Sequence, residues 1–593
     1  MRGAKDGGVA EEEAEALQGG EDAALAEDVP FDEEEEEEER RGGASSASLR
    51  IASFDEEVED EKRRGVGGFF LDRFRRWHDQ SVAIQELCIV LKLAAPIAGS
   101  YLCTMFIQLV SLFFVGHLGP TELAAAALGT MYCNALGFSL IIGLLSALDT
   151  LCSQAFGAQS YHRVGLVLQR AIVILMLLCI PIAAVWFFAE ELLLLAKQDP
   201  ETSRLAAVYT KTMIPALPCY VLFESLKRYL MAQSIVLPTM LASILGIVVN
   251  FIGNYVLIRI FSVGFIGAPL ALVLTYFTVT LALWLSVYCL SLHRKTWPGF
   301  QLSQCFQGWR EMFLLGLPGI VMICAEWWGF EIHALLAGKI GTNALAAHAL
   351  VLNTTALCYM VPLGISLATT VRVGNLVGDL NPTRASKCAR LMIYLTASEA
   401  SVVALCLFAA RHVWGYVFSS DDDVVAITAK ILPVVVCFLM FDGLNAVGGG
   451  ILRGVGWQKL GAAVNLVAFY AIGLPAAFLL AFTLDFGVAG LWMALGLSAI
   501  LSCLVFLSFI WLLDWKKVTV YGDLREKVAT NGERKEEDDQ EKRMMKMKQR
   551  TDVEEGEDVE LLEFQRTDEE DEATGSEEET KIEQRDKRYR TKE

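Results

Sequence analysis

The middle of this 593-residue chain has very little charge. Residues 81–514 contain only 19 acidic and 21 basic side chains, although the whole chain has 70 acidic and 50 basic ones. So long a segment with so few charges is typical of a polytopic membrane domain. It lacks a basic face that could neutralise phosphates, which excludes nucleic-acid binding by this region. The net charge of −20 therefore resides in the two ends of the chain.

Sequence signatures of disulfide bonds, metal sites, ATP binding and catalysis are also missing. The 14 cysteines are scattered between Cys88 and Cys503 without a C-x-x-C pair, which favours small apolar core residues over disulfides or a zinc site. The sequence has no P-loop, so direct driving by ATP is unsupported. No constellation of metal ligands or nucleophiles indicates an enzyme, and we expect neither a cofactor nor a metal.

Both ends of the chain are polar. Residues 1–86 include an unbroken acidic run from Asp32 to Glu39, and a basic cluster precedes the first apolar segment. Such a composition cannot bury enough apolar surface to fold, so we predict a disordered acidic N-terminal tail and a disordered charged C-terminal tail over 515–593. Because no signal-peptide pattern is visible, we expect the first apolar segment to direct the chain to the membrane.

Twelve apolar segments are long enough to cross a bilayer core of about 30 Å as helices of about 20 residues. No barrel-type alternation is present, so we predict an all-α membrane protein with twelve transmembrane helices. The segments lie near residues 90–115, 122–149, 167–189, 205–228, 236–260, 265–290, 313–337, 344–369, 388–412, 425–452, 461–482 and 487–513. We place helices 1–6 in an N-lobe over 87–292 and helices 7–12 in a C-lobe over 313–514, joined by a cytosolic linker over 293–312.

Lysine and arginine in the short connections predict the orientation of the chain. With both termini in the cytosol, the inner connections and adjoining helix ends hold 13 basic residues and the outer ones seven. We therefore expect cytosolic termini. For the location of the protein, the plasma membrane and the membrane of a vacuole or another acidic organelle both stay possible. We expect the protein to be a monomer.

The two halves of the chain resemble each other. The segment VGHLGPTELAAAAL from Val115 aligns with AGKIGTNALAAHAL from Ala337, and two further motif pairs align at nearly the same offset. Because this offset covers six helices, an even number, the halves share one membrane orientation and form parallel repeats. Two six-helix lobes around a central cleft indicate a transporter that rocks between two states.

Few acidic residues lie deep within the apolar segments. Glu326 and Glu331 lie in the seventh segment and Asp442 in the tenth. A carboxylate at the bilayer centre is costly unless it is paired, hydrated or protonated, so each is a candidate for binding a proton or a cation in turn. We rank Glu326 first, because Trp327 and Trp328 follow it and offer cation–π contacts. The alternative is that neighbouring helices satisfy these carboxylates and that the tryptophans only pack.

The two glutamates are five residues apart, which is about 140° on a helical wheel. We therefore expect both to face one cleft only if the helix bends. We also expect Asn445 and Gln108 to line the substrate cavity.

Further charged residues lie near the predicted cytosolic ends of the helices. Two interpretations of Asp149 and Arg372 stay open. One is a gating or interlobe ion pair, and the other is ordinary snorkelling of the charged groups toward the membrane surface. Glu224 is a weaker site candidate, since a salt bridge with Lys227 or Arg228 explains it equally well.

Six motifs occur in a fixed order along residues 87–514. They are VGHLG with ELAAAALG (115–129), SALDTLCSQAFGA (146–158), LMAQSIVLP (230–238), EWWGFE (326–331), VRVGNLVGD (371–379) and LRGVGWQ (452–458). In these motifs the chain resembles the eukaryotic branch of the multidrug and toxic compound extrusion (MATE) family. The tails lie outside the resemblance.

The resemblance implies a V-shaped, two-lobe antiporter that exports organic cations or other amphipathic metabolites in exchange for protons. It also implies that Glu326, Glu331 and Asp442 take part in coupling and substrate binding. Many prokaryotic members carry an aspartate in the first helix where Gln108 is the nearest residue here, which argues against an ion site of that kind. Vertebrate-type members often have glutamate in place of Asp442.

We therefore expect a proton-coupled exporter of organic cations, xenobiotics or amphipathic metabolites, with Na⁺ as a less favoured coupling ion. One alternative is an uncoupled channel or lipid scramblase, which downhill flux independent of a pH gradient would favour. Another is a multi-pass receptor or scaffold that acts through its tails, which loses its activity when residues 1–80 and 515–593 are deleted.

Overall fold

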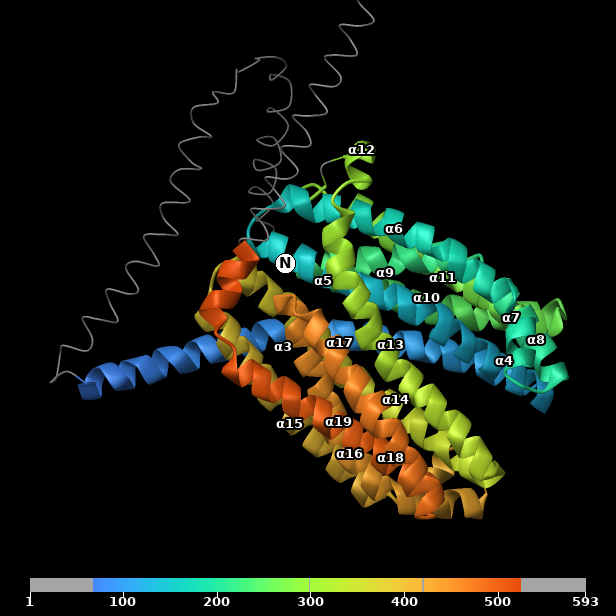
Figure 1. Cartoon of the computed structure of the whole chain (residues 1–593). Coiled ribbons are helices and arrows are strands. Elements are labelled where there is room, and N and C mark those ends of the chain that lie inside the picture. Colours follow the sequence, from blue (N-terminus) through green and yellow to red (C-terminus); the bar gives the residue numbers. More distant parts are fainter. Residues whose placement is uncertain (1–67, 298, 419–420, 524–593) are drawn as a thin grey trace, which may run out of the picture. The chain divides into compact units, whose positions relative to one another are not determined.

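The computed structural model describes residues 68–297, 299–418 and 421–523, and these residues are almost entirely helical (Figure 1). Residues 1–80 and 81–593 form separate units, and the helix packing discussed below belongs to the second. The predicted disorder of the tails is wrong for residues 68–86, which belong to a helix that continues into the first span, and for residues 515–523, which are also helical. For residues 1–67 and 524–593 it falls outside the described ranges and stays a prediction.

The first half of the chain forms a series of helices linked by short turns. They are α3 (Gly68–Gly116), α4 (Pro120–Cys133), α5 (Ser139–Gly157), α6 (Tyr161–Phe187), α7 (Ala189–Leu195), α8 (Pro200–Met213), α9 (Ala216–Ala232), α10 (Leu237–Asn254) and α11 (Gly267–Cys289). A π-helical turn, η1 (Asn134–Phe138), joins α4 to α5, and η2 (Tyr255–Ile260) and η3 (Gly264–Ile266) lie between α10 and α11.

The second half repeats this pattern. Its helices are α12 (Leu302–Cys305), α13 (Trp309–Ile340), α14 (Thr342–Gly378), α15 (Pro382–Ala410), α16 (Asp422–Val455), α17 (Gln458–Leu466), α18 (Leu474–Phe478) and α19 (Gly487–Leu512). The turn η4 (Trp414–Val417) precedes α16, while η5 (Val467–Gly473) and η6 (Leu479–Thr483) flank α18.

Local sequence signals explain where several helices begin. Proline occupies the first turn of α4, α8 and α15, where its missing N–H is not needed. The N-cap side chain of Asp199 accepts hydrogen bonds from the backbone N–H and the hydroxyl of Thr202, both at 2.9 Å. These bonds hold the pKa of Asp199 below its usual value. Asn381 caps α15 in the same way, through the N–H of Arg384.

Among the described helices, 11 segments are long and apolar enough to cross a membrane, and a bent pair raises the number to 12. The bent pair is α8 and α9, which meet at 56°. It corresponds to the predicted segment 205–228, which is therefore not one straight helix. Pro215 explains the break, because it has no N–H to continue the helix and its ring clashes with the carbonyl of the preceding turn. The other segments lie close to their predicted positions.

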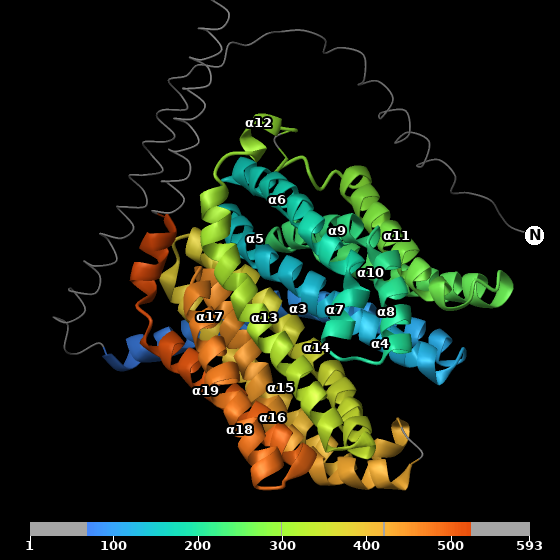
Figure 2. The same ribbon diagram turned by 45° about the vertical axis from the view of Figure 1, so that its right-hand side comes forward.

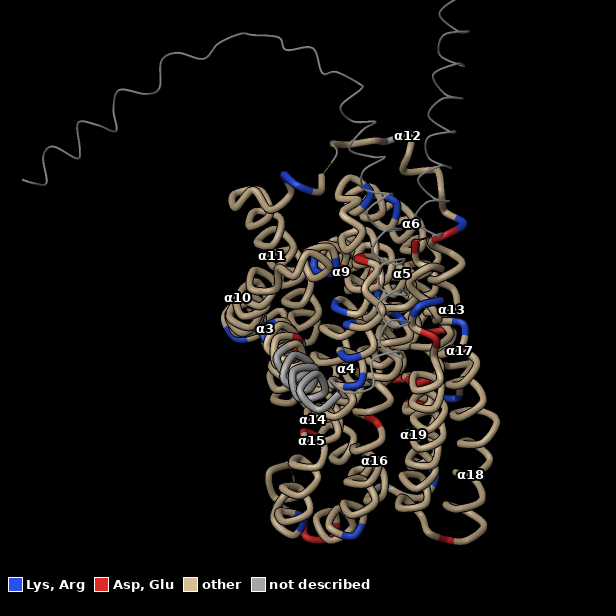
Figure 3. Tube along the Cα trace, turned by 90° about the vertical axis from the view of Figure 1, so that its left-hand side faces the viewer, with Lys and Arg blue, Asp and Glu red and all other residues tan. Residues whose placement is uncertain are grey.

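Buried apolar side chains group mainly by half of the chain. One large cluster consists of residues of α4 to α11 with parts of α3 and α13, and two further clusters hold mainly residues of α14 to α19, one of them together with residues of α3 and Met231 of α9. Figure 2 shows α13 to α19 gathered on one side of the molecule and α4 to α11 on the other. Charged residues collect toward the ends of the helices, with a smaller group midway along them (Figure 3).

Helix α3 belongs to both groups. Val90, Leu93 and Ile97, near its start, pack in a cluster with residues of α14, α15 and α16. Ile107 and Phe114, near its end, pack with the helices of the first half. The first span therefore bridges the two lobes, rather than packing only with the lobe to which it belongs in sequence.

Candidate functional site

A cavity of about 440 Å³ lies between helices of the two halves. Its walls come from α3, η1, α5, α9 and α11 in the first half and from α13, α14, α16, α17 and α19 in the second. This volume is within the range of small-molecule sites, which is about 300–1,000 Å³. The lining combines aromatic rings, amides and charged side chains.

The three acids predicted to be functional all line this cavity. Glu326 and Glu331 come from α13, and Asp442 comes from α16. Asp442 is buried, and its Oδ1 atom has no hydrogen-bond partner among the described residues. Over the same residues, none of the three acids forms a salt bridge with a lysine or arginine. The second half thus presents three carboxylates without basic partners.

Both glutamates contact the same cavity from the single helix α13, which has Pro318 within it, and the expected bend of this helix stays a prediction. The residues of α13 that line the cavity are Met322, Ile323, Glu326, Trp327, Phe330 and Glu331. At about 100° per residue, they fall within one half of the helix circumference. Met322 and Glu331 lie at the two edges of this broad stripe and Glu326 lies within it, so the cavity is wide enough to contact both acids.

The two tryptophans after Glu326 have different positions. Trp327 lines the cavity and is 36% exposed. The prediction that Trp328 also lines it is wrong, because Trp328 is two residues after Glu326, about 200° around the helix, and falls outside the stripe that faces the cavity. The Nε1 atom of Trp328 instead donates a hydrogen bond of 2.9 Å to the carbonyl of Ala135, so Trp328 packs against the first half.

The predicted amides lie in the cavity wall, Gln108 on α3 and Asn445 on α16. Sequence reasoning missed a group of aromatic side chains that share this wall: Tyr101, Phe138, Tyr220, Tyr276, Phe330, Tyr359, Phe438 and Phe506. They come from eight different elements, so no local spacing connects them. Their presence means that most of the cavity is apolar or aromatic, and the three predicted acids all lie on helices of the second half.

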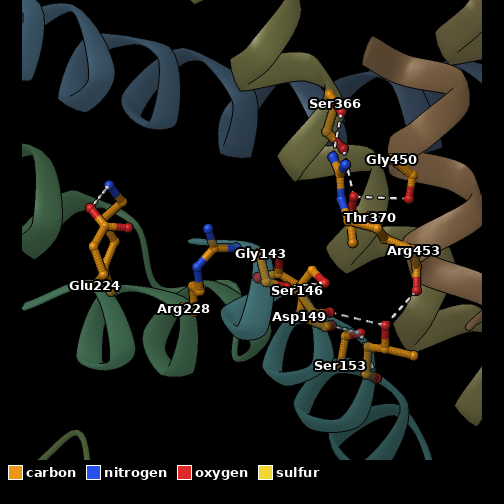
Figure 4. A network of polar contacts seen from close by, with 12 residues as sticks. Gly143, Ser146, Asp149, Ser153, Glu224, Arg228, Ser366, Thr370, Gly450 and Arg453 are labelled. Atoms are coloured by element: carbon orange, nitrogen blue, oxygen red, sulfur yellow. Dashed lines mark hydrogen bonds and ion pairs between the residues drawn. The ribbon is translucent and has the colours of Figure 1, made fainter. Parts of the chain in front are cut away.

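The acids of the first half are paired. Asp149 on α5 forms a buried salt bridge with Arg228 on α9, and Glu224 accepts a hydrogen bond of 2.8 Å from Lys227 (Figure 4). Asp149 therefore pairs within its own lobe and not across the lobes. The salt-bridge interpretation of Glu224 is confirmed, although this residue also lines the cavity. The ammonium of Lys227 also lies 3.8 Å from the centre of the Tyr101 ring.

Arg372 takes part in an ion cluster that joins α3 to the second half. Glu86 is fully buried, and its two oxygens accept hydrogen bonds from Nε and Nη2 of Arg372 at 2.7 and 2.9 Å. Arg384 donates a further bond of 2.8 Å from its Nε atom. A fork of two parallel bonds is the strongest geometry for an arginine and a carboxylate. The sequence placed Glu86 in the tail and gave no signal of this pairing.

The two lobes also touch through their backbones. The hydroxyl of Thr150 donates to the carbonyl of Arg453 at 2.6 Å, and Gln154 donates to that of Gly454 at 2.9 Å. A Cβ atom at Gly378 would lie 2.1 Å from the carbonyl oxygen of Gln154, so only glycine allows α5 and α14 to approach this closely. These contacts and the Glu86 cluster close the interface on the side that the orientation rule predicts to be cytosolic.

Comparisons with known proteins identify the family. The MatE family model matches residues 96–256 and 318–479, one match in each half. This chain belongs to the MatE family. The two matches also confirm the predicted internal repeat, and membership makes the chain an integral multi-pass membrane protein with two helical lobes.

Relatives cover most of the chain. It is 37% identical to multidrug and toxin extrusion protein 1 of Oryctolagus cuniculus, over 76% of this chain and 79% of the relative. It is 36% identical to the protein of the same name in Homo sapiens, over 75% and 78%. The crystal structure of the eukaryotic MATE transporter AtDTX14 superposes with a TM-score of 0.72 at 32% identity, over 75% of this chain and 99% of that one.

Proposed function

We propose that this MatE protein exports organic cations across a membrane in exchange for protons. Efflux is supported by its relatives, whose names describe multidrug and toxin extrusion and whose length it largely covers. The observation that carries the finer proposal is that Glu326, Glu331 and Asp442 share one cavity and have no basic partner among the described residues.

A carboxylate without a basic partner, in a site of low dielectric constant, is stabilised when its charge is neutralised. Burial disfavours the charged form of an acid, and either a bound proton or a bound cation removes that penalty. A cation and a proton therefore compete for Glu326 and Asp442. If the protein reorients slowly across the membrane while this site is empty and charged, each proton that enters is exchanged for a cation that leaves.

The aromatic wall supports a cationic organic substrate. Trp327 and Tyr359 line the same cavity as Glu326, and ring faces attract organic cations. An apolar lining also contributes binding energy to the hydrocarbon part of a substrate without requiring one particular shape. We further propose that both termini lie in the cytosol, which the distribution of lysine and arginine supports.

Transport into proteoliposomes tests the proposal. An imposed pH gradient should drive uptake of tetraethylammonium by the wild-type protein, and Glu326→Gln should reduce this uptake to background, because the amide cannot carry the exchanged proton. Glu201→Gln is the matched control, since Glu201 is an exposed acid at the start of α8. Wild-type uptake that ignores the pH gradient and follows a sodium gradient would overturn proton coupling.

A further inference from the structure

The cavity contains a positive charge that the exchange of cations and protons does not use. Arg453 lies near the end of α16 and is one of the lining residues. Its Nη2 atom donates a hydrogen bond of 3.1 Å to the hydroxyl of Ser366. Its Nε atom is buried and has no hydrogen-bond partner in the described part of the chain. Figure 4 shows the side chain pointing toward Ser366 and away from Asp149.

Arg453 differs in this respect from the other basic residues at the cavity. Arg228 is neutralised by Asp149, and Lys227 by Glu224. Glu326 and Asp149 lie within electrostatic range of Arg453, but neither forms a salt bridge with it, nor does any other described carboxylate. A guanidinium held away from bulk water without an anionic partner is unfavourable, so this position suits an anion that arrives from outside the protein.

Asp442 and Arg453 occupy different levels of the cavity. The Nη1 atom of Arg453 is 3.7 Å from the position that a Cβ atom of Gly449 would take, so the guanidinium reaches back one turn along α16. Gly449 is seven residues after Asp442, which is about 10 Å along the helix axis. The cavity therefore presents the carboxyl group of Asp442 and the guanidinium of Arg453 at different levels along α16.

We propose that Arg453 binds the carboxylate of zwitterionic substrates while the ammonium group of the same molecule binds beside Glu326 and Asp442. The inference rests on the proposed export of organic cations and adds a second substrate class to it. Guanidinium and carboxylate form paired, charge-assisted hydrogen bonds, which suit recognition of this group. The terminal nitrogens Nη1 and Nη2 supply the donors for such a pair, since Nε is buried and Nη2 also bonds the hydroxyl of Ser366.

Direct binding to the purified wild-type protein gives the first test. The probes are benzyltrimethylammonium, its 4-carboxylate, in which the carboxylate stands across the ring from the ammonium, and the methyl ester of that acid. We expect the 4-carboxylate to bind at least about tenfold more tightly than its ester, because the ester cannot form a charge-assisted pair. Equal affinities for the acid and the ester would overturn the proposal without any variant.

The variant Arg453→Gln gives the second test. It should weaken binding of the 4-carboxylate by about tenfold or more and leave binding of benzyltrimethylammonium unchanged or tighter, since a repelling charge is removed. Arg453→Lys should retain part of the affinity for the zwitterion. An equal loss for both probes would show that Arg453 only supports the fold.

The two proposals fail in different ways. If wild-type protein does not bind benzyltrimethylammonium at all, the proposed export of organic cations is wrong. If it binds this cation while Arg453→Gln leaves the preference for the 4-carboxylate intact, the role of Arg453 alone is wrong.

Discussion

The two halves of this molecule treat buried acids differently. In the first half, Glu224 pairs with Lys227, one turn along the same helix, and Asp149 pairs with Arg228 on a neighbouring helix. In the second half, Glu326 and Asp442 face the same cavity without one. A carboxylate with a permanent partner stabilises the fold and gains little from binding a proton. A carboxylate without one gains more from binding a proton or a cation, so the two halves of the repeat differ in how their buried acids are neutralised.

The largest effect expected from this comparison is at an unpartnered acid. Asp442→Asn should abolish uptake driven by a pH gradient and weaken binding of tetraethylammonium by at least about tenfold, because the amide keeps the shape and loses the charge. Flux assays and equilibrium binding on the same preparation measure the two effects. Unchanged affinity together with an unchanged dependence of uptake on pH would place Asp442 outside the mechanism.

A paired acid should respond mainly in stability. Arg228→Gln leaves the charge of Asp149 buried without its partner, and breaking a buried pair in this way costs about 3–5 kcal/mol. The double variant Arg228→Gln with Asp149→Asn should recover much of that loss, since no isolated charge remains. Thermal unfolding of the three proteins in one detergent measures this. A double variant as unstable as the single one would mean that the pair does more than satisfy charge.

The smallest effect is expected in the cluster around Glu86, where one acid has two basic partners. Arg384→Gln should cost about 1 kcal/mol of stability, because Arg384 is partly exposed and Arg372 still neutralises Glu86. Arg372→Gln removes the two-bond fork and should cost more. The difference in unfolding temperature between these two variants tests the order. A reversed order would show that Arg384 is the main partner.

Much of the fold could be predicted from the sequence, because a membrane span leaves a local signal. Length and apolarity gave the spans, and prolines at the first turn, such as Pro120 and Pro382, mark where helices begin. The break at Pro215 was harder to foresee, since most prolines in such helices only bend them. The acids of the site stood out for the same local reason, as isolated charges in apolar segments.

The remainder of the site depends on contacts between distant residues. Glu86 and Arg372 are 286 positions apart, and nothing near either one identifies the other. The direction of Trp328 depends on which face of α13 meets the first half, and the tyrosines of the wall lie on separate helices. Periodicity shows which face of a helix is apolar, but it does not show which other helix packs against that face.

The bridging position of α3 has a mechanical consequence. One part of this helix is held by the C-lobe, as far as Ile97, and the other by the N-lobe, from Ile107 onward. Any rotation of one lobe against the other has to be absorbed in the few residues between, just after Pro96, which already lacks one helical hydrogen bond. Tyr101 and Thr104 lie in that stretch and line the cavity, so such a rotation would also change the shape of the cavity wall.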